Sequence, residues 1–327
     1  MNKILGIGNA LIDALVQIKD EHLLEELNFP KGSMQLIDHE RFADVSSLLS
    51  PLVQKYTTGG SACNTIGALA RMGTPTALIG KVGNDQLSET FSANCTDCGI
   101  DAHLVHDAQL PTGVATTLIT PDGQRTFGTY LGAAADLTAA DLQPEWFEGC
   151  GYFYIEGYLV QNHALIRRAV RLAHEAGLKV CLDLASYNVV EAERDFFAEL
   201  LSETDIVFAN EYEACAFTGE DDPLANLEKF ASLCEIAVVK VGKRGVYVRR
   251  GDEQTFCEAR DVPHVVDTTA AGDYFSAGFL HALASGCSLM QCAQLGSMLA
   301  GHIIEVVGTA LDAATWEKLR KYAAELR

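Results

Sequence analysis

The chain has 327 residues, 48% hydrophobic and 21% charged, which is long enough for one large soluble domain or for one domain with a small appendage. The formal net charge of -20 argues against broad contact with nucleic acid or an anionic membrane, because both need a cationic surface. The ten cysteines lack a metal-site spacing, and no long apolar run or signal-peptide pattern is present, so we expect reduced thiols in a cytoplasmic protein.

Residues 3–8 predict a short buried strand. Asn9 and Asp13 flank the turn that follows it, at the end of a strand, where α/β sheets place ligands; the alternative is a turn carboxylate exposed to water. The G-x-G pattern within the first strand lacks the third glycine of a dinucleotide-binding fingerprint. An NAD-linked oxidoreductase is therefore disfavoured.

Several further strands partly alternate apolar with polar residues, as a half-exposed sheet requires. We expect them to form a small β lid, built from strands near 14–18, 33–37, 102–106 and 113–120. A lid of this kind would exclude water from an active site. A hairpin turn then leads to a return strand that carries Arg125.

Residues 58–73 combine a turn with a helix. Gly59 and Gly60 permit a ligand to approach the main chain. The helix that follows has small residues on one face, includes Asn64, and ends at a glycine.

From residue 152 onward, strands and helices alternate, and the strand segments are apolar without alternation. This pattern predicts strands that are buried on both faces, and hence a doubly wound, mostly parallel sheet flanked by helices. Asn210 and Glu213 form an N-x-x-E element at the end of one such strand, which taken alone is typical of a helix cap. Lys240 lies near the end of the next predicted strand (236–241), and Gly242 and Gly245 after it permit close approach of a ligand to the backbone.

Residues 267–273 (D-T-T-A-A-G-D) run straight into an apolar helical segment. The first turn of a helix has unpaired N–H groups and the positive end of the helix dipole, so a phosphate could bind there. Asp273 would then lie close to a phosphoryl group and could accept the proton of an attacking hydroxyl. The alternative is that Asp267 or Asp273 simply caps the helix.

Together, the G-G-S-A-C-N segment at 59–64 and the D-T-T-A-A-G-D segment at 267–273 resemble the two signature motifs of the ribokinase-like (PfkB) carbohydrate and nucleoside kinase family. The resemblance covers nearly the whole chain and implies one ribokinase-like domain over residues 1–327. It also implies that ATP phosphorylates a hydroxymethyl group on a sugar, a sugar acid or a nucleoside, with Mg2+ and often a monovalent cation such as K+.

The resemblance implies roles by position in the motifs. Asp273 is the base, the amides of Ala271, Gly272 and Asp273 form an anion hole, and Asp267 lies in the cation-binding loop. The substrate is expected to contact Asn9, Asp13, Gly59, Gly60, Asn64 and Arg125, although Arg125 also fits a solvated strand arginine. Nucleotide contacts are expected from Asn210, Glu213 (to Mg2+ through water), Lys240, Gly242 and Gly245.

Two positions depart from the family pattern. Ala270 stands where the family usually has glycine, and because alanine is poor at positive φ, the loop must take a negative φ there or carry strain. Lys240 stands where threonine is common, and contact of its longer, charged side chain with a phosphate is plausible.

The segment 130–137 is similar to adenosine-kinase-like members, so adenosine is the first substrate prediction, followed by fructose, ribose and 2-keto-3-deoxygluconate. A homodimer could form through the edges of the lid. The competing hypothesis is a sugar- or nucleotide-sensing protein that keeps the kinase fold without catalysis.

Overall fold

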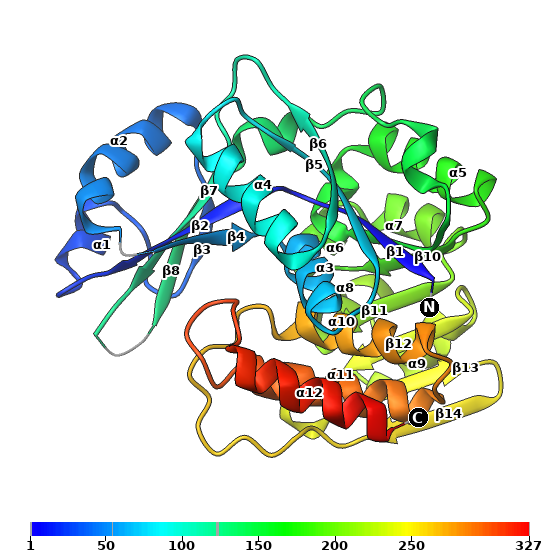
Figure 1. The fold of residues 1–327 in the computed structure, drawn as a ribbon. Helices are drawn as coiled ribbons and strands as arrows, with labels where there is room; N and C mark the ends of the chain where they lie inside the picture. Colours follow the sequence, from blue (N-terminus) through cyan, green and yellow to red (C-terminus); the bar gives the residue numbers. More distant parts are fainter. Residues whose placement is uncertain (1, 54, 122–123, 327) are drawn as a thin grey trace.

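The computed structural model describes residues 2–53, 55–121 and 124–326, which form two β-sheets with helices packed around the larger one (Figure 1). The larger sheet has nine strands in the order β14-β13-β12-β11-β10-β9-β1-β5-β6. Its strands are β1 (Lys3–Ile7), β5 (Thr76–Val82), β6 (Asp101–His106), β9 (Cys150–Glu156), β10 (Lys179–Asp183), β11 (Ile206–Asn210), β12 (Ile236–Lys240), β13 (Val246–Arg250) and β14 (Glu253–Cys257). Pairing is parallel from β12 through β6, whereas β13 and β14 are antiparallel.

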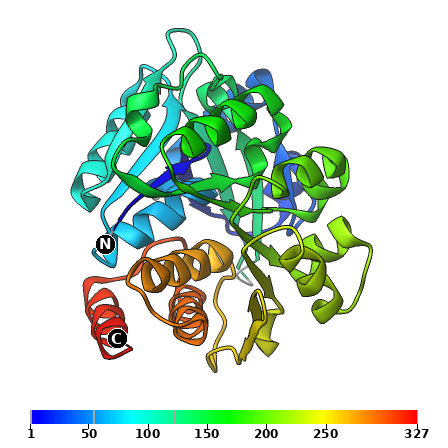
Figure 2. The ribbon, with the colours of Figure 1, turned by 90° about the vertical axis from the view of Figure 1, so that its right-hand side faces the viewer.

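Helices cover both faces of the larger sheet, as the apolar strand runs predicted. Successive residues of a strand point to opposite faces, so Ile4 packs into one core and Leu5 into the other. One face carries α3 (Ser61–Arg71), α4 (Gln86–Cys98), α10 (Ala271–Ala284), α11 (Leu289–Ile303) and α12 (Ala313–Glu325). The other carries α5 (His163–Glu175), α6 (Tyr187–Ala192), α7 (Arg194–Leu201), α8 (Glu211–Thr218) and α9 (Pro223–Ala231). Figure 2 shows the orange and red helices on the side opposite the green ones.

The smaller sheet projects away from the larger one, at the left of Figure 1. Its strand order is β3-β8-β7-β2-β4. The strands are β2 (Leu11–Gln17), β3 (Met34–Leu36), β4 (Lys55–Gly59), β7 (Gly113–Ile119) and β8 (Arg125–Tyr130). A separate apolar core, including Val16, Leu118 and Phe29, joins this sheet to α1 (His22–Glu26) and α2 (His39–Leu49).

One predicted lid strand was wrong. The segment 102–106 belongs to β6, which pairs with β5 at the edge of the larger sheet. An edge strand is half-exposed, so it shows the same partial alternation as a lid strand, and the sequence pattern does not separate the two. The other three predicted segments lie in the smaller sheet, whereas β4, which is short and polar, was missed.

Short 3-10 turns complete the secondary structure. They are Ser50–Leu52, Gly132–Asp136, Pro144–Phe147, Gly157–Gln161 and Gly242–Arg244. Among the helices of the described residues, none has both the length and the apolar character that crossing a membrane requires.

Candidate active site

Asp273 lies in the first turn of α10. Ala270 caps this helix with φ of 61°, in the left-handed region that costs a non-glycine residue about 1–2 kcal/mol. We expected the alanine in place of glycine at position 270 to take either a negative φ or a strained positive one, and the structure shows the strained one. The loop still runs continuously into the helix, because the Tyr274 amide donates to the Ala270 carbonyl at 2.9 Å.

The amides at the start of α10 differ in their availability. The Ala271 amide donates to the Thr268 carbonyl at 3.2 Å within the loop. Gly272 and Asp273 are the second and third residues of the helix, where an amide has no acceptor one turn earlier in the helix. The positive end of the helix dipole reinforces these two donors. Of the three amides predicted to form the anion hole, those of Gly272 and Asp273 are therefore the ones available to an anion.

The first turns of α3 hold Asp273 from the other side. Ser61 Oγ donates to Asp273 Oδ1 at 2.6 Å, and Asn64 Nδ2 donates to Asp273 Oδ2 at 2.9 Å. Thr65 Oγ1 donates to the Asp273 carbonyl at 3.3 Å. These three residues share one face of α3, because side chains three and four positions apart are neighbours on a helix. The structure thus brings the paired-glycine segment and the 267–273 segment together.

The electrostatics around Asp273 suit a general base. Burial raises the pKa of Asp273 to about 6, while the hydrogen bonds from Ser61 and Asn64 act in the opposite direction. Nearby Asp183 adds to the rise, and Lys240 opposes it. A carboxyl group of this pKa is mostly ionised near neutral pH, yet it is more basic than an exposed aspartate, as proton abstraction requires.

Lys240 and Asp183 end two strands at the same edge of the larger sheet. Lys240 Nζ lies 3.3 Å from Asp183 Oδ2, and Ser276 Oγ donates to the same oxygen at 3.3 Å. Asp183 Oδ1 accepts from the Ala185 amide at 2.9 Å. Sequence reasoning missed Asp183; its signal was a carboxylate at the carboxyl end of a buried strand, where α/β sheets place ligands.

The N-x-x-E element forms the helix cap that the motif alone suggested. Asn210 Oδ1 accepts from the amides of Tyr212 and Glu213, both at 2.9 Å. Glu213 Oε2 in turn accepts from the Asn210 amide at 2.7 Å. Burial raises the pKa of Glu213 above its ordinary value, so this cap also places a buried carboxyl group beside Lys240.

A cavity of about 940 Å³ joins these groups. Its lining includes Asp273, Gly272, Lys240, Glu213, Asn210, Gly242 and Gly245, and it continues along α11 past Ser297, Ala300 and Gly301. Gly245 has φ of 130°, and a Cβ there would lie 2.1 Å from the Cys257 carbonyl oxygen, so no side chain fits. The predicted nucleotide-binding residues and the loop at 267–273 therefore share one cavity.

The predicted substrate side lies at the end of β1 and at the base of the smaller sheet. A Cβ at Gly60 would lie 2.1 Å from the Asn9 carbonyl oxygen, and one at Gly59 would lie 2.1 Å from Asp13 Oδ1. Only glycines allow this close approach of the turn to Asn9 and Asp13. The side chain of Arg125, which begins β8, lies outside the described part of the structure.

Glu156 is a second buried carboxylate that sequence reasoning missed. It ends β9, is 1% exposed, and accepts from Asn9 Nδ2 at 2.7 Å and from the Ala62 amide at 2.9 Å. Burial raises the pKa of Glu156 to about 7. The Asn9 amide thus points to Glu156 in the interior, and Glu156 fastens the start of α3 to the end of β1.

Asp267 joins two loops beside the cavity. Its Oδ1 accepts from the Thr269 amide at 3.0 Å and from Thr269 Oγ1 at 2.8 Å, and its Oδ2 accepts from the Gly308 amide at 3.1 Å. The carboxylate therefore holds the start of the loop at 267–273 against the chain that follows α11.

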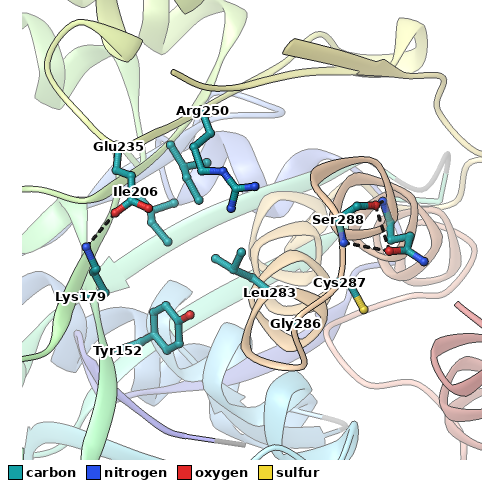
Figure 3. A pocket seen from close by; sticks show the side chains of 11 residues that line it. Tyr152, Lys179, Ile206, Glu235, Arg250, Leu283, Gly286, Cys287 and Ser288 are labelled. Atoms are coloured by element: carbon teal, nitrogen blue, oxygen red, sulfur yellow. Dashed lines mark hydrogen bonds and ion pairs between the residues drawn. The ribbon is translucent and has the colours of Figure 1, made fainter. Parts of the chain in front are cut away.

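A second hollow of about 650 Å³ lies at the opposite, amino ends of the strands, between Tyr152, Lys179 and the start of α11 (Figure 3). Its charged groups are paired: Lys179 Nζ lies 2.7 Å from Glu235 Oε2, and Arg250 Nη2 lies 2.9 Å from Glu253 Oε2. The amide and ammonium groups that could bind a phosphate, and the candidate base Asp273, all lie at the other end of the sheet.

Comparison with known proteins identifies the family of this chain. The model of the pfkB family carbohydrate kinases matches residues 33–316. The chain is 28% identical to an adenosine kinase of Schizophyllum commune over 97% of this chain and 98% of that protein. It is also 28% identical to a 2-dehydro-3-deoxygluconokinase of Bacillus subtilis, over 82% of this chain and 87% of that protein.

A solved structure of a kinase is also similar to this chain. The adenosine kinase from Sinorhizobium meliloti superposes with a TM-score of 0.86 and 34% identity, covering 98% of this chain and 99% of the other. The fold, the motifs and these similarities agree. The chain is therefore a sugar or nucleoside kinase of the pfkB family, on the adenosine-kinase-like side of that family.

Proposed function

We propose that this protein transfers the γ-phosphoryl group of ATP to a hydroxymethyl group, with Asp273 as the general base. The observation that carries the proposal is the position of the Asp273 carboxylate, held by Ser61 and Asn64 at the mouth of α10. A carboxylate and helix-terminal amides at one point match the needs of phosphoryl transfer, because the base and the charge-stabilising donors must meet the same group.

In the proposed reaction, the hydroxyl oxygen of the acceptor forms a bond to the γ-phosphorus. The bond from that phosphorus to the β,γ-bridging oxygen breaks, and its electron pair leaves with ADP. The hydroxyl proton goes to the Asp273 carboxylate. The Gly272 and Asp273 amides stabilise the charge on the phosphoryl oxygens, and the smaller sheet excludes water that would otherwise hydrolyse ATP.

For the acceptor, adenosine is our first proposal, with fructose, ribose and 2-keto-3-deoxygluconate next. The similarity to adenosine kinases supports the first, and the similarity to a 2-dehydro-3-deoxygluconokinase keeps a sugar acid among the candidates. Asp13, Gly59, Gly60 and Asn64 would meet acceptor hydroxyls, and Arg125 would come from the lid. Asn9 would act through its hydrogen bond to Glu156.

For the nucleotide, ATP would bind along the cavity formed by Asn210, Glu213, Lys240, Gly242 and Gly245. Mg2+ commonly binds one or two carboxylates together with substrate phosphates, and the buried Glu213 carboxyl group at this cavity fits that role through water. The ion would neutralise charge on the phosphates. K+ beside Asp267 is a further proposal, supported by the position of this carboxylate between the loop at 267–273 and the chain that follows α11.

Two further proposals concern the state of the protein. Strand β3 lies at the edge of the smaller sheet and exposes Met34 (51%) and Leu36 (60%), which supports a homodimer through the lid. Light scattering should then show that Leu36→Lys shifts the protein to a monomer; a monomeric wild type would contradict the dimer proposal.

All ten cysteines are free, which supports the reducing cytoplasm as the place of action.

The function is tested by incubating the protein with ATP, Mg2+ and a panel of nucleosides, sugars and sugar acids, and measuring ADP release. We expect release that depends on the acceptor, with the highest kcat/KM for adenosine. A higher value for another acceptor would overturn the substrate proposal alone. Absence of acceptor-dependent release across the panel would contradict the kinase proposal and favour a sensing protein.

A further inference from the structure

The Lys240 ammonium group borders the amides that would receive the transferred phosphoryl group. A Cβ at Gly272 would lie only 3.3 Å from Lys240 Nζ, so the lysine reaches from the end of β12 to the first turn of α10. The Lys240 side chain is 15% exposed and lines the cavity, where a bound ligand would contact it.

The groups around Lys240 keep it charged. Burial by itself lowers the pKa of Lys240, but the neighbouring carboxyl groups of Asp183, Glu213 and Asp273 more than offset this and raise it above the ordinary value. A cation held in this way is fixed in place before any ligand arrives, which is the condition for electrostatic catalysis.

The cavity needs such a cation. Asp183, Glu213 and Asp273 would together repel the phosphates of ATP, and the protein as a whole carries a formal net charge of -20. Two other basic side chains line the cavity. Arg260 is bound to Glu305 at 2.6 Å, and Lys243 lies in an exposed turn.

We propose that Lys240 is a catalytic residue that contacts the γ-phosphoryl oxygens of ATP and stabilises their charge during transfer to the acceptor. This inference rests on the proposed function. The bonds that form and break are those described above, the proton still goes to Asp273, and Lys240 remains protonated throughout. Its contact with Asp183 at 3.3 Å is long for an ion pair of this kind and anchors the lysine beside the phosphate.

A different role would be purely structural, in which Lys240 only neutralises the buried Asp183 carboxylate. The two roles differ in one respect. If Lys240 only compensates Asp183, removal of both charges restores function. If Lys240 contacts the phosphoryl group, removal of both leaves the defect of the lysine variant, and Asp183→Asn alone keeps the contact.

The experiment measures binding of ADP and of an ATP analogue with a non-hydrolysable β,γ bridge, by calorimetry with Mg2+. Wild type, Lys240→Met, Asp183→Asn and the double variant are compared, with Lys321→Met as a matched control that removes a surface lysine paired with Glu317. We expect Lys240→Met and the double variant to lose the preference for the analogue over ADP by about tenfold or more, because a charge-assisted hydrogen bond is lost. Asp183→Asn and Lys321→Met should keep the preference.

Turnover gives the second readout. With the preferred acceptor, kcat should fall by about 100-fold or more in Lys240→Met and in the double variant, which is the effect of losing one preorganised donor. Recovery of analogue preference or kcat in the double variant would overturn the proposal, as would an unchanged preference in Lys240→Met. If Lys240→Met does not fold because Asp183 is left unpaired, the double variant decides.

The binding of ADP and of the ATP analogue is measured without an acceptor. A wild type that phosphorylates nothing would therefore contradict the proposed function, while the analogue preference would still test Lys240 on its own.

Discussion

The Ser61 hydroxyl donates a hydrogen bond to Asp273 Oδ1 at 2.6 Å, so the residue directly after the paired glycines holds the carboxylate that we propose as the base. This contact joins the start of α3 to the start of α10. It fixes the direction of the carboxylate, and it opposes the rise in pKa that burial causes.

Replacement of Ser61 by alanine should therefore raise the pKa of Asp273 further. A base with a higher pKa becomes protonated at a higher pH, so the acidic limb of the pH profile of kcat/KM should move upward from its wild-type position near 6. Loss of activity in Ser61→Ala should be greater at pH 6 than at pH 8. The matched control is Ser202→Ala, whose hydroxyl bonds the Glu199 carbonyl on the surface; an unmoved acidic limb in Ser61→Ala would refute this role.

Ala270→Gly should stabilise the protein. Glycine adopts φ of 61° without the steric cost that alanine carries, although its greater freedom in the unfolded chain offsets part of the gain. We expect the free energy of unfolding in urea to rise by about 0.5–1 kcal/mol. Ala93→Gly, at an exposed position inside α4, should instead lose about 1 kcal/mol. A loss in both variants would show that Ala270 is not strained.

The free energy of unfolding should fall as the pH rises from about 5 to 8. Glu156 has a pKa of about 7 in the folded protein and an ordinary value near 4.5 when unfolded, so between these values the folded state binds the extra proton. Stability linked to this group is full below the unfolded pKa and is lost as the pH passes the folded one, by about 1–3 kcal/mol. Urea unfolding at several pH values should show this slope.

Glu156→Gln should reduce that slope, because one titrating group is gone, whereas Asp273 and Glu213, whose pKa values are also raised, continue to contribute. Glu175→Gln, at the exposed end of α5, serves as the control and should leave the slope unchanged. Equal slopes in wild type and Glu156→Gln would mean that Glu156 does not take up the proton.

Much of the fold follows from local sequence patterns. The apolar runs at 206–209 and 236–241 predicted strands buried on both faces, and the observed strands β11 (Ile206–Asn210) and β12 (Ile236–Lys240) both lie inside the larger sheet. The strand at Asp101–His106 was misplaced because an alternating pattern reports half-exposure and does not say which sheet provides it.

The site was predictable where a motif carried it. Asp273 and the paired glycines lie in two motifs, at 267–273 and 59–64, that are rich in small residues. The structure brings Ser61 of one motif within hydrogen-bond distance of Asp273 of the other. Asp183 and Glu156 were missed because a carboxylate at the end of a strand is a weak signal when no motif accompanies it. Their roles arise from contacts with Lys240 and Asn9, which come from distant parts of the chain.

The most direct test is Asp273→Asn, measured as kcat with saturating ATP and the preferred acceptor, alongside calorimetric binding of both ligands. Loss of the base should lower kcat by about 100- to 10,000-fold while the fold and the binding of both ligands are kept. Near wild-type turnover in this variant would contradict the role of Asp273 as the general base.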